Sequence, residues 1–285
     1  TLNKEKTPSF SVNAKEGFYH CFGCKASGDI FRFVMDYQKT DFPEAMKILS
    51  EYSGIPLSEK TDKEIQEEKQ KEKMLDLLKR ANEYFRGNLL YDSAELARQY
   101  VRERGITKQD IEQFNIGFAF PGFQNFLNDF IKTNEEKKIA IKLGLLKQTD
   151  KSTYDFFRNR IMFPIKNEKG QVIGFSGRII EDSEEAKYIN SPNSEVYDKG
   201  KSFYNLDLAI ESIKKNREAV LVEGVLDVIG LYRKGVRPVI ALLVTGFIEI
   251  HARLLKKYCD KVYLMFDSDQ AGKKSAFRSI GYFEK

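Results

Sequence analysis

Short apolar runs alternate with helix-like segments in the last quarter of the chain. The runs Ala219–Val222, Val239–Val244 and Val262–Phe266 are rich in Val, Ile and Leu and bounded by polar residues, which is typical of buried strands. The segments between them, Leu226–Lys234 and Ile248–Tyr258, have the apolar spacing of helices. This β-α-β-α-β order predicts a parallel sheet with right-handed crossovers.

Acidic residues follow two of these strands. Glu223 comes directly after the first strand, and Asp267 and Asp269 come after the third. Ligands of parallel sheets bind beyond the carboxyl ends of the strands. Three carboxylates that converge there repel one another unless a divalent cation lies between them. The sequence therefore predicts a metal site built from Glu223, Asp267 and Asp269.

The first fifty residues have a different pattern. Two short strands, Ser9–Val12 and Gly17–Cys21, lead into a C-x2-C turn formed by Cys21 and Cys24. Two thiolates at this spacing can bind one tetrahedral Zn2+, and Gly23 is expected to give the turn its backbone freedom. Because zinc needs four ligands, a redox pair or two small buried residues are the alternatives. A helix is expected from residue 30.

The pattern of apolar and polar residues changes twice in the middle of the chain. The stretch 58–74, SEKTDKEIQEEKQKEKM, is almost free of apolar residues and suits an exposed helix start or a flexible tether, of which we favour the tether. Helical periodicity follows from Met74, and strands begin near Tyr154. There Arg160–Lys166 and Gln171–Ile180 flank a turn, which predicts a hairpin. We therefore expect domains at 1–56, 74–217 and 218–285, with a charged linker at 57–73.

A polar, aromatic and basic stretch, KYINSPNSEVYDKGKSFYNL, follows the hairpin. Lys187, Tyr188, Asn190 and Lys199 in it are of the types that hold phosphates and stack on bases. An ordinary exposed loop is the alternative interpretation.

Composition narrows the class of protein. The 285 residues suffice for two or three domains, and 41% hydrophobic with 31% charged residues is ordinary for a globular protein without a membrane span. Three cysteines indicate a reducing, cytoplasmic setting. The net charge of +5 permits a nucleic-acid partner without indicating one. Thr1 is followed by no signal-peptide pattern, and we expect the chain to be trimmed at both ends.

Three stretches resemble, in order, the parts of one family, the bacterial DnaG-type DNA primases. TPSFSV and YHCFGCKASGDIFRF look like its zinc-binding domain. FRNRIMFPIKNEKGQVIGFSGRII and the stretch after it are similar to the amino-terminal half of its RNA polymerase domain. VEGVLDVI and MFDSDQAGKKSA resemble its Toprim catalytic fold. The resemblance covers nearly the whole chain.

The resemblance implies an α+β multidomain fold. It implies a small zinc-ribbon-like β domain, a mixed α/β polymerase subdomain, and an α/β Toprim subdomain with a Rossmann-like parallel sheet. It also implies a DNA-directed RNA polymerase that makes short RNA primers from NTPs on single-stranded DNA. The expected partners are the template, NTPs, the nascent primer and, through a domain outside this chain, the replicative helicase; no membrane is involved.

The resemblance also implies metal ligands and binding residues. Cys21 and Cys24 would hold a structural Zn2+ together with a Cys and a His that precede Thr1. Glu223, Asp267 and Asp269 would hold catalytic Mg2+ or Mn2+, with Asp227 as a further acidic position. The NTP- and template-binding positions fall on Arg104, Arg158, Arg160, Arg178, Lys187, Tyr188, Asn190 and Lys199.

Two other functions remain open, and a departure from the family pattern supports the second of them. Leu242-Leu243-Val244-Thr245 stands where the family usually has Ser-Leu-Gly-Thr, and Gly246 comes one residue late. A different Toprim enzyme, a topoisomerase or nuclease, shares the acidic residues but needs a cleavage nucleophile, typically a tyrosine. A non-catalytic zinc-containing protein that binds single-stranded DNA is the other alternative.

Overall fold

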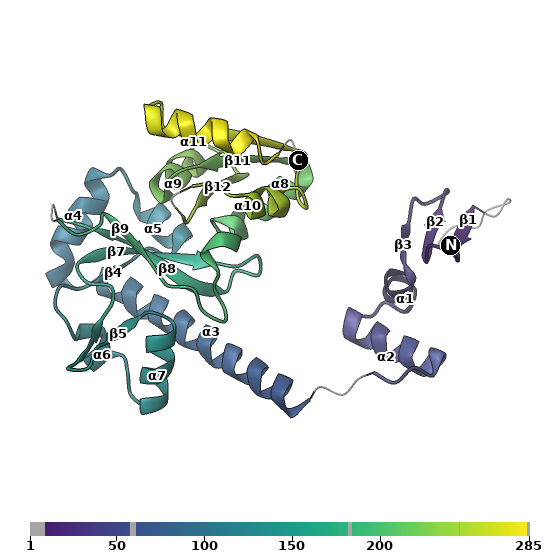
Figure 1. Cartoon of the computed structure of the whole chain (residues 1–285), viewed down its shortest axis with the longest axis horizontal. Coiled ribbons are helices and arrows are strands. Elements are labelled where there is room, and N and C mark those ends of the chain that lie inside the picture. Colours follow the sequence, from purple (N-terminus) through teal and green to yellow (C-terminus); the bar gives the residue numbers. More distant parts are fainter. Residues whose placement is uncertain (1–8, 58–60, 182–183, 245, 284–285) are drawn as a thin grey trace. The chain divides into compact units, whose positions relative to one another are not determined.

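The chain divides into two compact units, 1–66 and 67–285. The computed structural model describes residues 9–57, 61–181, 184–244 and 246–283 (Figure 1). Thr245, part of the altered loop, lies outside the described residues. In the described part of the chain, no helix is both long and apolar enough to span a bilayer.

The first unit holds a small antiparallel sheet followed by two helices. The elements are β1 (Phe10–Asn13), β2 (Phe18–Cys21), β3 (Ser27–Asp29), α1 (Ile30–Gln38) and α2 (Phe42–Ser53), with β2 at the centre of the sheet. Asp29 caps α1, since its Oδ1 accepts the N–H of Arg32 at 2.8 Å. The two expected strands and the helix start are confirmed.

The charged stretch is a helix and not a tether. Residues 62–73 form the first half of α3 (Asp62–Asn88), which corrects the favoured interpretation of this segment. Its Glu, Lys and Gln residues are good helix formers. Lys73 and Arg80 also pair with Glu135 and Glu136, at 2.6 and 2.9 Å, so the helix is tied to a neighbouring element of the second unit.

An antiparallel sheet in the order β4-β7-β8-β9 forms the centre of the next region, with α3 below it in Figure 1. The predicted hairpin is confirmed as β7 paired with β8. The elements are η1 (Asp92–Ala94), α4 (Glu95–Glu103), α5 (Lys108–Phe114), β4 (Gly117–Ala119), α6 (Asn125–Asp129), α7 (Asn134–Lys142), β5 (Leu146–Gln148), β6 (Thr153–Asp155), β7 (Arg160–Lys166), β8 (Val172–Ile179), β9 (Tyr188–Asn190) and η2 (Lys199–Lys201).

The predicted parallel sheet is confirmed in the last region. Its strands lie in the order β10-β12-β11-β13, and β11 pairs in parallel with both β12 and β13. The elements are β10 (Phe203–Tyr204), α8 (Leu206–Asn216), β11 (Glu218–Val222), α9 (Val225–Arg233), β12 (Val239–Leu242), α10 (Glu249–Leu255), β13 (Lys261–Met265) and α11 (Gln270–Ile280). Strand order reverses at β11 and β13, which is where ligands of open α/β sheets bind.

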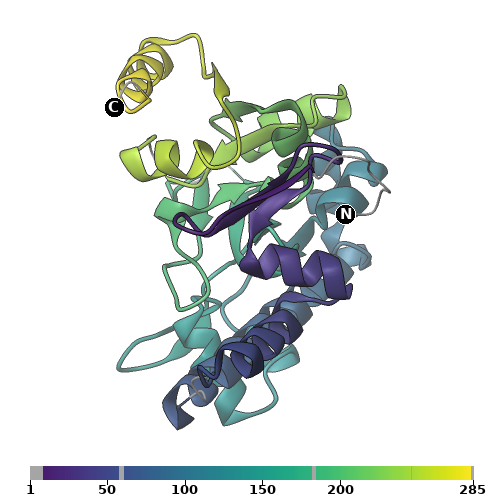
Figure 2. The same ribbon diagram turned by 90° about the vertical axis from the view of Figure 1, so that its right-hand side faces the viewer.

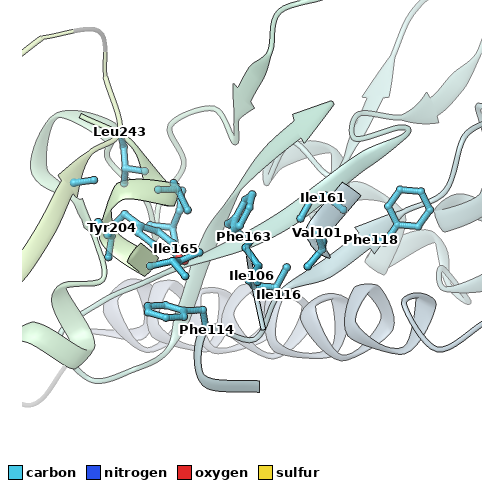
Figure 3. Packing of buried hydrophobic residues seen from close by; sticks show 14 of the residues in the cluster. Val101, Ile106, Phe114, Ile116, Phe118, Ile161, Phe163, Ile165, Tyr204 and Leu243 are labelled. Carbon is cyan, nitrogen blue, oxygen red and sulfur yellow. The ribbon is translucent and has the colours of Figure 1, made fainter. Parts of the chain in front are cut away.

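Helices cover both faces of this sheet. Val225, Val228 and Ile229 of α9 join a cluster that also holds Phe163 and Ile165 of the antiparallel sheet, so one core connects the two sheets (Figure 3). Side chains of α8 and α10 pack on the opposite face.

Strand β13 departs from the prediction. It alternates between exposed and half-buried residues, whereas we expected a strand buried on both faces. The reason is its place at the edge of the sheet, where Tyr263 and Met265 remain 40% and 52% exposed. The α11 helix that follows lies at the outer end of the second unit (Figure 2).

Candidate active site at the carboxyl ends of β11 and β13

A cavity of about 660 Å³ lies where the parallel sheet meets the antiparallel sheet. Its lining brings together seven of the residues that the sequence singled out: Arg178, Tyr188, Asn190, Lys199, Glu223, Asp227 and Asp267. The other lining residues are Ser176, Gly224, Val225, Leu226, Leu242, Leu243 and Val244. The lining therefore combines an acidic group of residues at the ends of β11 and β13 with a basic and aromatic group on β8, β9 and the loop after β9.

The acidic side repels further negative charge. Burial raises the pKa of Glu223, and the carboxylates of Asp267, Asp269 and Asp227 raise it further. Burial also raises the pKa of Asp227, with a contribution from the charge of Asp267. Asp227 is held in place because its Oδ2 accepts the N–H of Gly224 at 3.0 Å. The acidic side therefore favours a bound cation.

Asp269 has a different role from its neighbours. Its Oδ1 accepts the N–H of Gly272 at 2.7 Å and so caps α11. It is not among the lining residues of the cavity. Within the described ranges, no three His, Cys, Asp or Glu side chains are grouped to hold one ion. The expected cluster of three is therefore divided: Glu223 and Asp267 share the cavity, and Asp269 stands beside it.

The carboxylate oxygens of Glu223 and Asp267 nevertheless fit Mg2+ or Mn2+, the ions that the family resemblance implies. Carboxylate oxygens are the ligands that Mg2+ and Mn2+ prefer. A divalent cation beside Glu223 and Asp267 would also remove the repulsion that raises the pKa of Glu223.

Arg178 is the centre of the basic side. Its Nη1 donates to the Tyr188 hydroxyl at 2.8 Å, and its Nε donates to the Tyr100 hydroxyl. The guanidinium lies 4.9 Å from the Tyr188 ring centroid and 5.7 Å from that of Tyr100. Arg104 in turn lies 5.2 Å from the Tyr100 ring. Tyr100 is not among the residues predicted from the sequence, although its position four residues before Arg104, the C-cap of α4, was a usable signal.

Asn190 and Lys199 are fixed through their neighbours. The Nδ2 of Asn190 donates to the carbonyl of Leu243 at 2.7 Å, which connects β9 to the residues after β12. The backbone N–H of Lys199 donates to the Oδ1 of Asn193 at 3.0 Å. These bonds hold the loop between β9 and β10 against the cavity.

Arg160 is buried within the fold, and the binding role that the family resemblance implies for it stays a prediction. Its side chain is 2% exposed and donates to the carbonyls of Gly177, Ala186 and Lys187 at 3.2, 2.9 and 3.3 Å. It also pairs with Glu185 at 2.9 Å. A buried guanidinium satisfied in this way holds the backbone around residues 185–187 in place.

Arg158, Lys187 and Arg104 do not line the cavity. Arg158 donates to the carbonyl of Asp155 at 2.9 Å, and its guanidinium lies 4.9 and 5.6 Å from the rings of Phe123 and Tyr154. Lys187 and Arg104 are exposed. The structure therefore does not gather the predicted basic residues into a single pocket.

The C-x2-C turn brings two thiols together. Cys21 is buried and Cys24 exposed, and the Lys25 N–H donates to the Cys21 carbonyl at 2.8 Å. A backbone hydrogen bond from Cys24, aided by the Ser9 hydroxyl, lowers the pKa of Cys21 to about 7. The expected role of Gly23 is wrong, because the residue with positive φ (63°) is Lys25. Two such sulfurs fit half of a tetrahedral zinc site.

Comparison with known proteins agrees with these features. Residues 2–65 match the CHC2 zinc finger, residues 84–210 the N-terminal domain of the DNA primase catalytic core, and residues 220–285 a Toprim-like domain. The DNA primase of Lactococcus lactis is 40% identical over 281 residues, which are 97% of this chain and 44% of that protein. The chain thus spans less than half the length of that curated relative.

Solved structures extend the comparison. The zinc-binding and RNA polymerase domains of the Aquifex aeolicus primase superpose with a TM-score of 0.68 at 34% identity, covering 99% of this chain and 68% of that one. A DnaG primase catalytic domain bound to ssDNA has a TM-score of 0.68 at 34% identity, covering 74% of this chain and 68% of that one. The chain therefore belongs to the DnaG-type family of bacterial DNA primases.

Proposed function

We propose that the chain provides the zinc-binding and catalytic parts of a DNA primase, a nucleotidyltransferase that makes short RNA primers on single-stranded DNA. The cavity at the ends of β11 and β13 carries the proposal, because its lining combines Glu223 and Asp267 with Arg178 and Lys199. Nucleotidyl transfer needs a cation-binding side and a phosphate-binding side around one space.

In the proposed reaction, a 3′-hydroxyl attacks the α-phosphate of an incoming NTP, and pyrophosphate leaves. Mg2+ or Mn2+ at Glu223 and Asp267, with Asp227 close by, would lower the pKa of the hydroxyl and offset the phosphate charge. These carboxylates act as ligands, since metals bind their ionised form.

The basic side would bind and orient the nucleotide. Arg178 is held between two tyrosine rings and offers its remaining N–H groups to phosphate oxygens. Lys199 also lines the cavity and would add a second positive charge. Both residues would favour the transition state, in which negative charge accumulates on the phosphates.

The remaining parts of the proposal follow from the family. Cys21 and Cys24 would hold a structural zinc ion, and that unit would contact the template. The exposed Arg104 and Lys187 and the half-exposed Arg158 would contact the template backbone. The replicative helicase would be a partner, and the reaction would take place at the replication fork in the bacterial cytoplasm.

Incorporation of labelled ribonucleotides on a single-stranded template with Mg2+ or Mn2+ tests this function, using the full-length protein that carries this sequence. Asp267→Ala is expected to lower incorporation at least about 100-fold, because a metal ligand is lost. Asp260→Ala is the control, since Asp260 pairs with Arg217 on the surface at 2.6 Å. Absent incorporation, or incorporation that survives Asp267→Ala, would refute the proposal, and strand scission would favour a nuclease.

A further inference from the structure

Tyr100 is a half-buried side chain that the proposed mechanism does not use. It lies on α4, next to the buried Val101, and its ring packs against the core cluster that connects the two sheets. It is not among the lining residues of the cavity. Its hydroxyl nevertheless accepts the Nε–H of Arg178 on β8, 78 residues further along the chain. A residue outside the cavity therefore contacts a cation of the lining.

Arg178 is held from two elements of the fold. Tyr188 is its partner in the pairing of β8 with β9, and the Tyr188 hydroxyl accepts the Nη1–H at 2.8 Å. Tyr100 approaches from α4 and accepts the Nε–H. The guanidinium also lies within cation–π range of both rings, at 4.9 and 5.7 Å from their centroids. Because two nitrogens of one rigid planar group are bound, its orientation is fixed better than by either bond alone.

This arrangement leaves the third nitrogen of Arg178 for a ligand. Among the residues that the structure describes, Nη2 has no hydrogen-bond partner, and Arg178 lines the cavity. A long side chain loses rotamer freedom when a ligand fixes it. A guanidinium that is already oriented loses less, and the ligand then binds more tightly.

The Tyr100 ring also lies near a second cation, which offers an alternative role. The guanidinium of Arg104, at the C-terminal end of α4, is 5.2 Å from the ring centroid. Arg104 is exposed and does not line the cavity. In the described part of the chain it contacts the ring alone, whereas Arg178 contacts both the ring and the hydroxyl. The hydroxyl of Tyr100 therefore acts on Arg178.

We propose that Tyr100 is a positioning residue that orients the Arg178 guanidinium toward the triphosphate of the incoming nucleotide. The ligand of Arg178 rests on the proposed function, whereas the orientation of Arg178 by Tyr100 does not. Without the hydroxyl, Nε–H loses its acceptor in the protein, and the guanidinium is free to take other orientations.

Removal of one oxygen atom tests this role. Tyr100→Phe keeps the ring and its packing, but Nε of Arg178 loses its acceptor. We expect Y100F to raise the KM for NTPs about fivefold with a smaller change in kcat, the size expected for one lost hydrogen bond. The Tm should stay within about 2 °C of the wild-type value, because no buried apolar contact is lost.

Tyr91→Phe is the matched control. Tyr91 is 61% exposed, and its hydroxyl has no hydrogen-bond partner among the described residues. This variant should leave the KM unchanged. A wild-type KM in Y100F would contradict the proposal.

Double-mutant cycles identify the residue through which Tyr100 acts. Arg178→Lys keeps a positive charge but has no counterpart of Nε. In that background, Y100F should change the affinity for ATP in a binding titration by less than about twofold. In the Arg104→Ala background, Y100F should keep its effect of about fivefold. The opposite pattern would assign Tyr100 to Arg104, and an equal effect in every background would make its role purely structural; either result would contradict the proposal.

Crystal structures of the wild-type and Y100F proteins separate this inference from the proposed function. We expect Arg178 to have a single orientation in the wild type and more than one in Y100F. An unchanged single orientation in Y100F would overturn the proposal even in an active enzyme. If the wild type forms no primers, the proposed function fails, while the orientation of Arg178 still decides the role of Tyr100.

Discussion

At the scale of single residues, Gly272 determines where Asp267 can lie. A Cβ on residue 272 would come within 2.2 Å of the Asp267 carbonyl oxygen, closer than any real contact. We therefore expect Gly272→Ala to displace the Asp267 loop and to lower primer synthesis at least tenfold, about the effect of misplacing a ligand. Incorporation assays and circular dichroism melting would measure activity and folding separately.

Gly230→Ala is the matched control for that substitution. Gly230 lies inside α9, and nothing is within 4 Å of its added Cβ. Alanine there should leave activity unchanged and add about 0.5–1 kcal/mol of stability, because it reduces the freedom of the unfolded chain. Wild-type activity in Gly272→Ala would show that Asp267 does not need this close approach.

The residue types in the sequence predicted the chemistry of the site better than they predicted which side chains are exposed. Glu223 and Asp267 could be placed together because strand ends in a parallel sheet meet at one edge. Arg160 could not be told from Arg178 by sequence, since both are arginines on the same hairpin. Their difference arises in three dimensions: Arg160 meets three backbone carbonyls in the core, and Arg178 meets two tyrosines at the cavity.

At the scale of elements, the carboxyl groups at the ends of β11 and β13 affect the stability of the fold in a direction that can be predicted. The pKa values of Glu223 and Asp227 are raised in the fold. Carboxyls with raised pKa values stabilise the fold fully below their unfolded pKa values, and this contribution is lost as the pH rises through the folded values. The cluster therefore opposes folding at neutral pH unless a cation is bound.

Thermal unfolding with and without added Mn2+, at pH 7.5 and constant zinc concentration, tests whether the acidic cluster destabilises the fold in the absence of a cation. Mn2+ should raise the Tm of the wild-type chain, since it binds the folded state. Asp267→Asn should raise the Tm without Mn2+, because a repelling charge is removed, and should weaken the response to Mn2+. If Mn2+ raised the Tm of both proteins equally, the metal would bind at a different site.

Elements with strong periodicity were predictable, and those decided by their neighbours were not. β11, β12 and the β7–β8 hairpin follow from apolar runs and turn residues in the sequence. β13 has a similar run, but its edge position leaves one face exposed. The first half of α3 has no apolar stripe. Its residues have high helix propensity, and Lys73 at its end pairs with Glu135 of α7, neither of which periodicity reports.

At the scale of the whole molecule, the modest net charge of +5 makes the position of each cation more important than the total. Arg104 and Lys187 are exposed and lie outside the cavity. Arg160 is buried in the antiparallel sheet, and the residues that follow Lys187 belong to the same sheet. We therefore expect substitutions of Arg104 and Lys187, but not of Arg160, to change how binding to the template depends on salt.

The salt dependence of binding to single-stranded DNA distinguishes these residues. Each phosphate contact contributes about 0.7 to the slope of log affinity against log salt concentration. Arg104→Ala and Lys187→Ala should each reduce the slope by about that amount and leave the Tm nearly unchanged. Arg160→Lys keeps the charge but cannot satisfy the same carbonyls, so it should leave the slope intact and destabilise the fold by about 1–3 kcal/mol. An altered slope with an unchanged Tm in Arg160→Lys would return that residue to the binding surface, because a guanidinium with a purely structural role affects folding before it affects DNA.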